Sequence, residues 1–158
     1  MAAQTQSPPY GSYAAITAAF AGGLAAAGAL SRLLRRDPQC QTALDFVVLS
    51  AATFKAARTL SHDEVTSFLR QPFVRGDAHS GEDEEPVEGG FEQAYGELGT
   101  CTRCIGTWAA AGLAATQVIA PRFGRLLTWS LGAAAANDFF QAGFSGLTAK
   151  ANQLEEQG

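Results

Sequence analysis

YAAITAAFAGGLAAAGAL, residues 13–30, is the stretch that decides the fold. It carries no charged residue on any side, and the charge-free region around it extends from Met1 to Ser31. A helix on the surface of a soluble protein has a polar face, whereas a helix that crosses a bilayer needs about 18 or more apolar residues in a row. The stretch therefore predicts a transmembrane helix. Because no basic residues precede it, as they would in a cleavable signal peptide, we expect this helix to be retained.

Three further stretches are poor in charge. Residues 103–122 and 126–149 are long enough to cross a bilayer, and the second is interrupted only by Asp138. In residues 42–57 two charged residues bracket nine uncharged ones, so this stretch spans only if the charged side chains reach the headgroups. An ionised side chain near the bilayer centre costs about 2.5 to 3.5 kcal/mol. The gaps between charges therefore predict three or four transmembrane helices.

The fold class that follows is all-α, an integral membrane helical bundle that forms a single membrane domain over residues 1–158. Small residues are frequent in the long runs, and in a bilayer they allow helices to approach closely. We expect a multi-pass protein of the cell membrane. The alternative is a soluble, alanine-rich helical bundle, which a mean hydropathy of +0.01 favours.

The net charge of −4 combines two opposite populations. Eight acidic residues and no lysine or arginine lie between Asp77 and Glu97, and the remaining 11 basic and seven acidic residues give +4. The acidic character therefore belongs to one segment, and nucleic-acid binding does not follow from it. Five arginines lie at 32–36 and 121–125 and six basic residues lie elsewhere, so the positive-inside rule leaves the orientation open.

Residues 58–103 form the long polar segment between the expected helices. Its first part, residues 62–71, has apolar residues at helical spacing and is followed by Pro72, which predicts a short amphipathic helix at the membrane interface. Residues 76–90 are rich in glutamate, aspartate and glycine and lack aromatic residues, so we expect an acidic, flexible loop. The segment ends at a CxxC motif at the start of the next expected helix.

Several short motifs occur in a fixed order between Phe54 and Leu147. They are FKAAR at 54–58, GEL at 96–98 followed by the cysteine pair, and ANDFFQ at 136–141. With these motifs the chain resembles a family of small bacterial integral membrane proteins of unknown function, found in bacilli, actinobacteria and phages. The resemblance supports the membrane prediction and implies no catalytic residue. The candidate functional residues are Asp63, Arg70, Pro72, Glu97, Gly106, Trp108 and Asp138.

Cys101 and Cys104 have a spacing that allows either a disulfide or two ligands of a tetrahedral metal. At a helix start, the helix dipole and Arg103 would stabilise a Cys104 thiolate, which a redox function needs. Zinc would need about four ligands, which a second copy of the pair could complete. The other cysteines and histidines are Cys40, His62 and His79. Structural thiols or a structural disulfide, a zinc site and a redox pair all remain open.

Asp138 lies between four alanines and two phenylalanines, where a carboxylate is costly unless it is neutral or paired. Arg58, Arg70 and Asn137 could pair with it. A proton or ion relay is one interpretation of this residue. A helix-end position at the lipid headgroups is the interpretation that we favour.

The sequence contains no Ser/His/Asp nucleophile set, glycine-rich phosphate loop or HExxH helix. We therefore expect a non-enzymatic protein without a cofactor, which acts as a structural or accessory subunit or scaffold of a membrane assembly. Its expected partners are the lipid bilayer and a homo-oligomer or other membrane protein subunits, with no nucleic acid. The alternative function is a membrane thiol protein that uses the CxxC pair for disulfide exchange or metal binding. A third is a small transporter or pore in which Asp138 faces water.

Overall fold

The computed structural model describes residues 8–36, 42–76 and 84–156. The longer helices are α1 (Tyr10–Leu33), α2 (Ala43–His62), α4 (Gly90–Thr100), α5 (Thr102–Ile119) and α6 (Pro121–Glu156). The shorter elements are η1 (Glu64–Thr66), α3 (Ser67–Arg70), η2 (Gln71–Phe73), β1 (Val74–Arg75) and β2 (Glu85–Pro86). The two strands pair antiparallel, with Val74 opposite Pro86. The predicted all-α fold class is confirmed.

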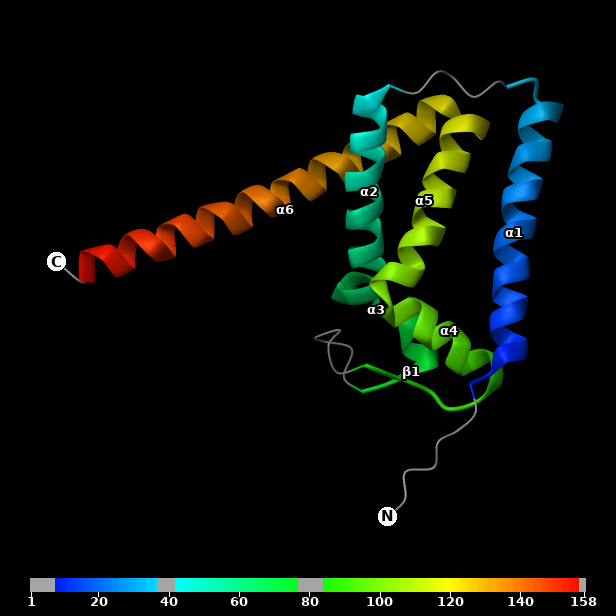
Figure 1. The fold of residues 1–158 in the computed structure, drawn as a ribbon, viewed down its shortest axis with the longest axis horizontal. Helices are drawn as coiled ribbons and strands as arrows, with labels where there is room; N and C mark the ends of the chain where they lie inside the picture. The colour runs from blue at the N-terminus through cyan, green and yellow to red at the C-terminus, as the bar shows by residue number, and fades with distance from the viewer. Residues whose placement is uncertain (1–7, 37–41, 77–83, 157–158) are drawn as a thin grey trace, which may run out of the picture.

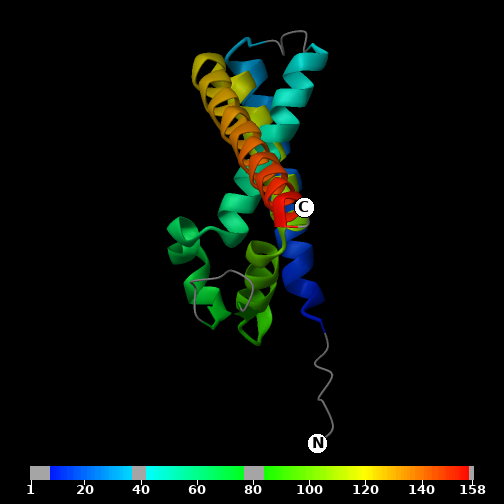
Figure 2. The same ribbon diagram turned by 90° about the vertical axis from the view of Figure 1, so that its left-hand side faces the viewer.

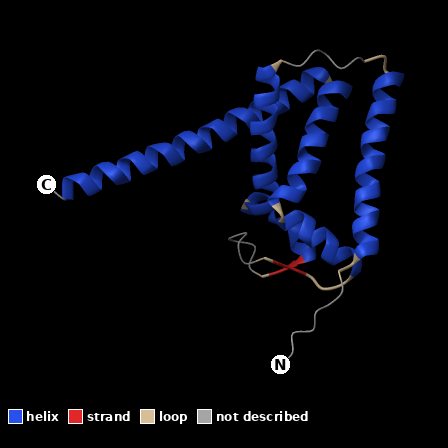
Figure 3. Cartoon of the chain, in the orientation of Figure 1, coloured by secondary structure: helices blue, strands red, loops and turns tan. Residues whose placement is uncertain are grey.

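α1, α2 and α5 run in alternating directions, and α5 contacts both of the others (Figure 1). The short elements and α4 gather at one end of these helices, which we call the hairpin end (residues 60–76 and 84–104; Figure 3). The opposite end, which we call the turn end, contains residues 31–36, 42–47 and 119–125. From there α6 crosses α2 and then projects away from the other helices, as Figure 1 and the perpendicular view in Figure 2 show.

α2 approaches α5 and α6 closely because small residues face each other at the crossings. Ala57 of α2 and Ala135 of α6 are almost fully buried. A Cβ added to Gly106 of α5 would lie 3.7 Å from the Cβ of Ala57. One added to Gly132 of α6 would lie 3.1 Å from Cγ1 of Val48. The frequent small residues of the sequence therefore form the contact surfaces between helices.

The connection between α5 and α6 is a single residue, Ala120, followed by Pro121 at the start of α6. Proline suits that position because the first amide groups of a helix have no intrahelical partner. A Cβ on Gly124 would lie 2.6 Å from Cα of Gln117, so glycine is required for the two helices to meet this closely. The Gln117 side-chain amide donates a hydrogen bond to Oγ1 of the buried Thr128 (2.9 Å), which connects the two helices further.

α1 is attached to the rest of the chain by few contacts, and none of its residues is buried. The ring of Phe20 packs edge-on against Trp108 of α5, with ring centroids 5.1 Å apart. The hydroxyl of Tyr13 donates a hydrogen bond to the carboxylate of Glu97 in α4. Most of the surface of α1 is therefore apolar and uncovered.

Helices form at all four places where spans are predicted. Among the helices of the described residues, α1 is the one that is long and apolar enough to cross a membrane. The runs at 42–57, 103–122 and 126–149 form α2, α5 and α6. The mean hydropathy of these three helices is lower because alanine contributes little to it, and because α2 contains Lys55 and α6 contains Asp138.

The single amphipathic helix expected at 62–71 is divided into η1 and α3. The chain is extended at Asp63, and the reason is that the last carbonyl oxygens of α2 have side-chain partners. They accept hydrogen bonds from the Thr66 hydroxyl and from the Arg70 guanidinium. Pro72, expected to stop a helix, lies exposed in η2, after the chain has already changed direction.

The acidic, flexible loop expected at 76–90 falls only partly within the described residues. Residues 77–83 lie outside the described part of the chain. Glu84 is buried, β2 follows it directly, and Gly90 begins α4. The ion pair with Arg70 fixes Glu84 directly before β2.

Candidate functional site

The candidate site lies at the hairpin end, where α2 ends and α5 begins. It brings together polar and sulfur-containing side chains from segments that are distant in sequence. We call it the junction site, and its members are Ser61, His62, Thr66, Arg70, Glu84, Cys101, Thr102 and Cys104.

Arg70 and Glu84 form a buried, bidentate ion pair, with 3% and 9% of their surface exposed. Nε and Nη2 of Arg70 donate hydrogen bonds to the two carboxylate oxygens of Glu84, at 2.9 and 3.0 Å. Nη1 donates to the carbonyl oxygen of Leu60 (2.7 Å) and to Oγ1 of Thr66 (3.1 Å). One guanidinium group therefore connects the end of α2, η1 and the residue that precedes β2.

A buried ion pair is stable only when hydrogen bonds replace the water that both charges lose. The pair meets this condition, because all three guanidinium nitrogens of Arg70 have acceptors. Within the described residues, no buried side-chain nitrogen or oxygen lacks a partner. Because these contacts join Arg70 to the end of α2 and to Glu84, the role of the pair is to hold the short elements against α2.

Glu97 and its neighbours in the GEL motif attach α4. The Glu97 carboxylate accepts hydrogen bonds from the Tyr13 hydroxyl and from the side-chain amide of Gln93 (2.9 Å). A Cβ on Gly96 would lie 3.2 Å from the Cβ of Pro86 in β2, so glycine allows α4 to lie directly on the strands. Both residues therefore have structural roles.

Cys101 and Cys104 form a disulfide at the start of α5, with their Cα atoms 5.3 Å apart. Cys101 is the N-cap residue, and its Sγ accepts a hydrogen bond from the backbone N–H of Cys104 (3.3 Å). Cys104 is exposed and Cys101 is half-buried. In this oxidised state neither sulfur is a thiolate that could bind zinc. The described residues also contain no group of three or more His, Cys, Asp or Glu that could hold a metal.

Ser61 and His62 connect α2 to Thr102, the first of the two residues between the cysteines. The Ser61 hydroxyl donates to the carbonyl oxygen of Ala57 (2.8 Å) and lies 2.6 Å from Nδ1 of His62 and 3.1 Å from Oγ1 of Thr102. Because its proton is directed at a carbonyl oxygen, Ser61 accepts the hydrogen bond from His62 Nδ1. A buried serine in this arrangement is not an activated nucleophile, and the network is structural.

Asp138 lies outside the junction site, where α6 crosses α2. Its Oδ2 lies 2.8 Å from Nζ of Lys55. The partner of Asp138 is therefore Lys55, and not Arg58, Arg70 or Asn137, which the sequence suggested. The rings of Phe54 and Phe139 stack beside this ion pair, with centroids 5.6 Å apart. Two charges that each interrupt an apolar run therefore neutralise each other.

The other predicted residues have separate positions. Gly106 and Trp108 lie on α5 and contact α2 and α1. Asp63 contributes its backbone, since its carbonyl oxygen accepts a hydrogen bond from the Thr66 hydroxyl (3.0 Å). The structure thus brings Arg70 and the two cysteines into one region, beside Asp63, and leaves Gly106, Trp108 and Asp138 outside it.

Sequence reasoning missed three residues that make buried or partly buried polar contacts. Glu84 is one acid in a run of eight, and nothing in the sequence distinguishes it from its neighbours. Ser61 also carries no recognisable signal. Lys55 could have been found, because a lysine in one apolar run and an aspartate in another are natural partners once both helices are buried together.

The Arg70–Glu84 pair generates a prediction about stability. Arg70→Met should lower the free energy of unfolding by about 3–5 kcal/mol, because it leaves the Glu84 carboxylate buried without a partner. The double variant Arg70→Met/Glu84→Leu should recover most of this loss. Denaturant unfolding in detergent measures both, with Arg75→Met at an exposed position as the control that stays within about 0.5 kcal/mol of the parent. A single Arg70 variant as stable as the parent would contradict the role assigned to the pair.

Comparison with known proteins places the region that contains this site in a family. A family model described as "Protein of unknown function (DUF1360)" matches residues 48–144, from α2 through the junction site and α5 into α6. α1 lies outside the matched region. No curated protein and no solved structure matches the chain significantly. Because the match covers more than half of its length, the chain belongs to the family of unknown function DUF1360.

Proposed function

We propose that the protein is a multi-pass membrane protein with a structural function, and that it pairs with a second copy of itself through the projecting half of α6. In this proposal α1, α2, α5 and α6 cross the bilayer in alternating directions. The observation that carries the proposal is the exposed apolar face of α6 beyond Asp138. A structural or accessory subunit is the function that this face and the internally paired side chains of the described junction site support best.

The register between α2 and α6 supports the alternating arrangement. Val48 meets Gly132, and Lys55, seven residues later on α2, meets Asp138, six residues later on α6. The two helices therefore run in the same direction where they touch. α1 and α5 run in the opposite direction (Figure 1). α1, α2 and α5 therefore each connect the turn end and the hairpin end, and α6 starts from the turn end alongside α2 before it projects away from the bundle (Figure 1).

The charge and surface of the helices suit a bilayer. An unpaired lysine or aspartate within a span is costly, and the Lys55–Asp138 ion pair lowers that cost for both residues. Large apolar side chains on the outward faces of α2 and the first half of α6 are exposed and would contact lipid acyl chains. They include Leu44, Phe46, Val47, Phe123 and Leu126.

A non-enzymatic function is supported by the junction site itself. All three guanidinium nitrogens of Arg70 donate hydrogen bonds to acceptors within the chain, and Ser61 donates to a carbonyl oxygen. Both cysteines are joined to each other. Within the described residues this site presents no general base beside an accessible nucleophile.

The projecting half of α6 carries a regular apolar stripe, which we call the α6 seam. Four large side chains in it are exposed: Phe140 (76%), Phe144 (73%), Leu147 (74%) and Leu154 (62%). With Ala151 they follow the alternating four- and three-residue spacing of the core positions in a two-stranded coiled coil. Large apolar groups with this period pack best against another helix with the same period.

The charges beside the α6 seam favour a parallel second copy as that helix. Lys150 directly precedes a core position and Glu155 directly follows one, so they occupy the g and e positions of the heptad. In a parallel pair, a g residue faces the e residue five positions later on the other strand. Lys150 of each copy would therefore meet Glu155 of the other, and two-fold symmetry makes this contact twice.

The four-span arrangement predicts which residues share a side of the membrane. Cys40, between α1 and α2, and a cysteine introduced as Gln153→Cys should lie on opposite sides, because three helices separate them. In intact spheroplasts, a membrane-impermeant maleimide should label one and reach the other only after permeabilisation. Cys40→Ser, with and without Gln153→Cys, identifies the labelled residue. If α1 alone crossed the membrane, both positions would react under the same condition, which would refute the multi-pass arrangement.

The α6 seam predicts a specific cross-link. In a Cys40→Ser background, Leu154→Cys should form a disulfide between two copies in native membranes under mild oxidation, whereas Gln153→Cys, one residue outside the seam, should not. Lys150→Glu should lower the cross-linked fraction by roughly fivefold, because two ion pairs of up to about 1 kcal/mol each are replaced by repulsion. Lys150→Glu/Glu155→Lys should restore it. Equal cross-linking at 153 and 154 would exclude the parallel pair.

A second candidate function is thiol–disulfide exchange. It is favoured by the exposure of Cys104 and by the hydrogen bond that Cys101 Sγ accepts from the backbone N–H of Cys104. A thiolate of a protein dithiol would attack Sγ of Cys104, the S–S bond would break, and Cys101 would leave as a thiolate stabilised by that N–H. The second thiolate of the dithiol would then displace Cys104. The dithiol is thereby oxidised to a disulfide, and the cysteine pair is reduced.

Serine variants of the two cysteines distinguish these functions. For a structural disulfide we expect Cys101→Ser, Cys104→Ser and the double variant to lower the melting temperature in detergent by the same amount, because one cysteine alone cannot form the bond. Neither single variant should form covalent adducts with other proteins. Mixed disulfides that accumulate on non-reducing gels with Cys101→Ser, but not with Cys104→Ser, would favour exchange instead.

A further inference from the structure

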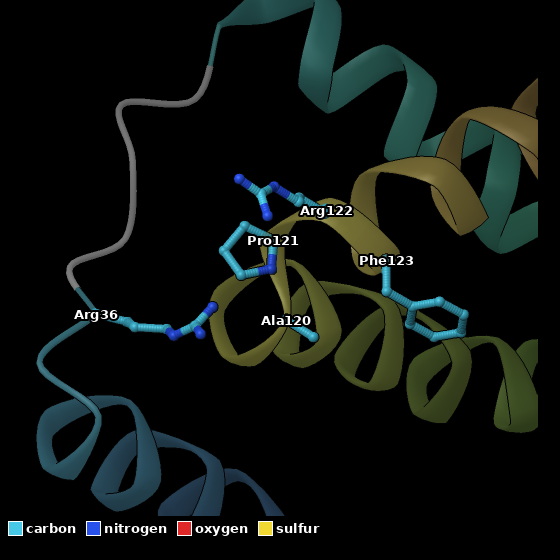
Figure 4. A pocket seen from close by; sticks show the side chains of 5 residues that line it. All are labelled: Arg36, Ala120, Pro121, Arg122 and Phe123. Atoms are coloured by element: carbon cyan, nitrogen blue, oxygen red, sulfur yellow. The ribbon is translucent and has the colours of Figure 1, made fainter.

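A cavity of about 540 Å³ lies at the turn end, between the end of α1 and the turn that joins α5 to α6. Its lining residues are Arg36, Ala120, Pro121, Arg122 and Phe123. Figure 4 shows Arg36 reaching from the end of α1 toward the turn, with the Arg122 side chain on the other side of Pro121. Two cations that are far apart in sequence therefore border one apolar-walled space.

Neither arginine has a counter-charge among the described residues. Both ion pairs in the described part of the chain, Lys55–Asp138 and Arg70–Glu84, lie elsewhere. The described acid at the turn end is Asp45, whose carboxylate accepts hydrogen bonds from the backbone N–H and hydroxyl of Thr42 (3.0 and 2.8 Å). As far as the described residues go, the cavity is therefore a positively charged space whose two arginines have no acidic partner.

Neighbouring groups add to the positive potential. Three more arginines, Arg32, Arg35 and Arg125, lie at the same end of the molecule. α6 begins at the cavity, so the positive end of its dipole points there. An arginine presents several N–H groups in a planar fork that matches the oxygens of a phosphate group.

We propose that this cavity binds the phosphate group of an anion, held by Arg36 on one side and Arg122 on the other. The walls formed by Ala120, Pro121 and Phe123 would contact the carbon atoms attached to the phosphate. Both an anionic phospholipid headgroup and a free phosphate offer this chemistry. The exposed side chains of Phe123, in the cavity wall, and of Leu33, the last residue of α1, would contact acyl chains, which favours the lipid. That the phosphate belongs to a lipid rests on the proposed membrane location. That the cavity binds a phosphate does not depend on it.

The purified full-length protein in neutral detergent tests the proposal by calorimetric titration. Dioctanoyl phosphatidylglycerol should bind saturably, and dioctanoyl phosphatidylcholine should bind more weakly, because the arginines repel its ammonium group. Arg36→Gln and Arg122→Gln should each weaken phosphatidylglycerol binding by roughly tenfold, which corresponds to the loss of one charged hydrogen-bonding partner. Arg75→Gln, an exposed arginine at the hairpin end, is the matched control and should leave binding unchanged.

The titration also distinguishes the source of the phosphate. Inorganic phosphate that binds by itself and displaces the lipid would identify a free phosphate as a ligand, whereas lipid binding without competition would identify the headgroup. Circular dichroism of each variant separates loss of binding from loss of folding, and Arg36 follows α1 in an exposed position that tolerates substitution. Unchanged phosphatidylglycerol binding in the folded Arg36→Gln and Arg122→Gln variants would overturn the proposal, even if the multi-pass arrangement holds.

Discussion

The buried ion pair of Arg70 and Glu84 determines how the chain is arranged between α2 and α5. Burial of two charges costs several kcal/mol per ion unless every lone pair and proton is used, and here the backbone at the end of α2 supplies the remaining acceptors. The same hydrogen bonds end α2 and keep the short elements compact. With those elements fixed, Gly96 can place α4 against β2, and α5 starts at the cysteine pair beside Ser61.

The sequence predicts the long helices and the small-residue contacts, because both depend on local composition. Charge-free runs identify the helices, and glycines such as Gly106 and Gly132 occur at the crossings, as close packing requires. The polar contacts could not be predicted in the same way. The partner of Arg70 is chosen from eight similar acids by the path of the chain, and a composition argument treats all eight as solvated. The division of residues 62–71 follows from that same unpredicted pairing.

The candidate site illustrates the same limit. The spacing of Cys101 and Cys104 predicts a pair at a helix start, and the structure has a disulfide there with Cys101 as the N-cap. The residues beside it, Ser61 and His62, come from α2 and enter the site only because α2 and α5 pack closely. Spacing within one segment is therefore informative about chemistry, whereas contacts between segments depend on the three-dimensional fold.

Pairing inside the fold leaves the remaining charges unevenly distributed between its ends. The two cations that lie within the bundle or are buried, Lys55 and Arg70, are neutralised by Asp138 and Glu84. Among the described residues, the turn end has five arginines and one acid, Asp45. Most of the glutamates lie at the hairpin end. An overall charge of −4 thus describes a molecule with one basic and one acidic end. Among the described residues, the electrostatic attraction of anions is consequently expected to be strongest at the turn end, where the cavity between Arg36 and Arg122 lies.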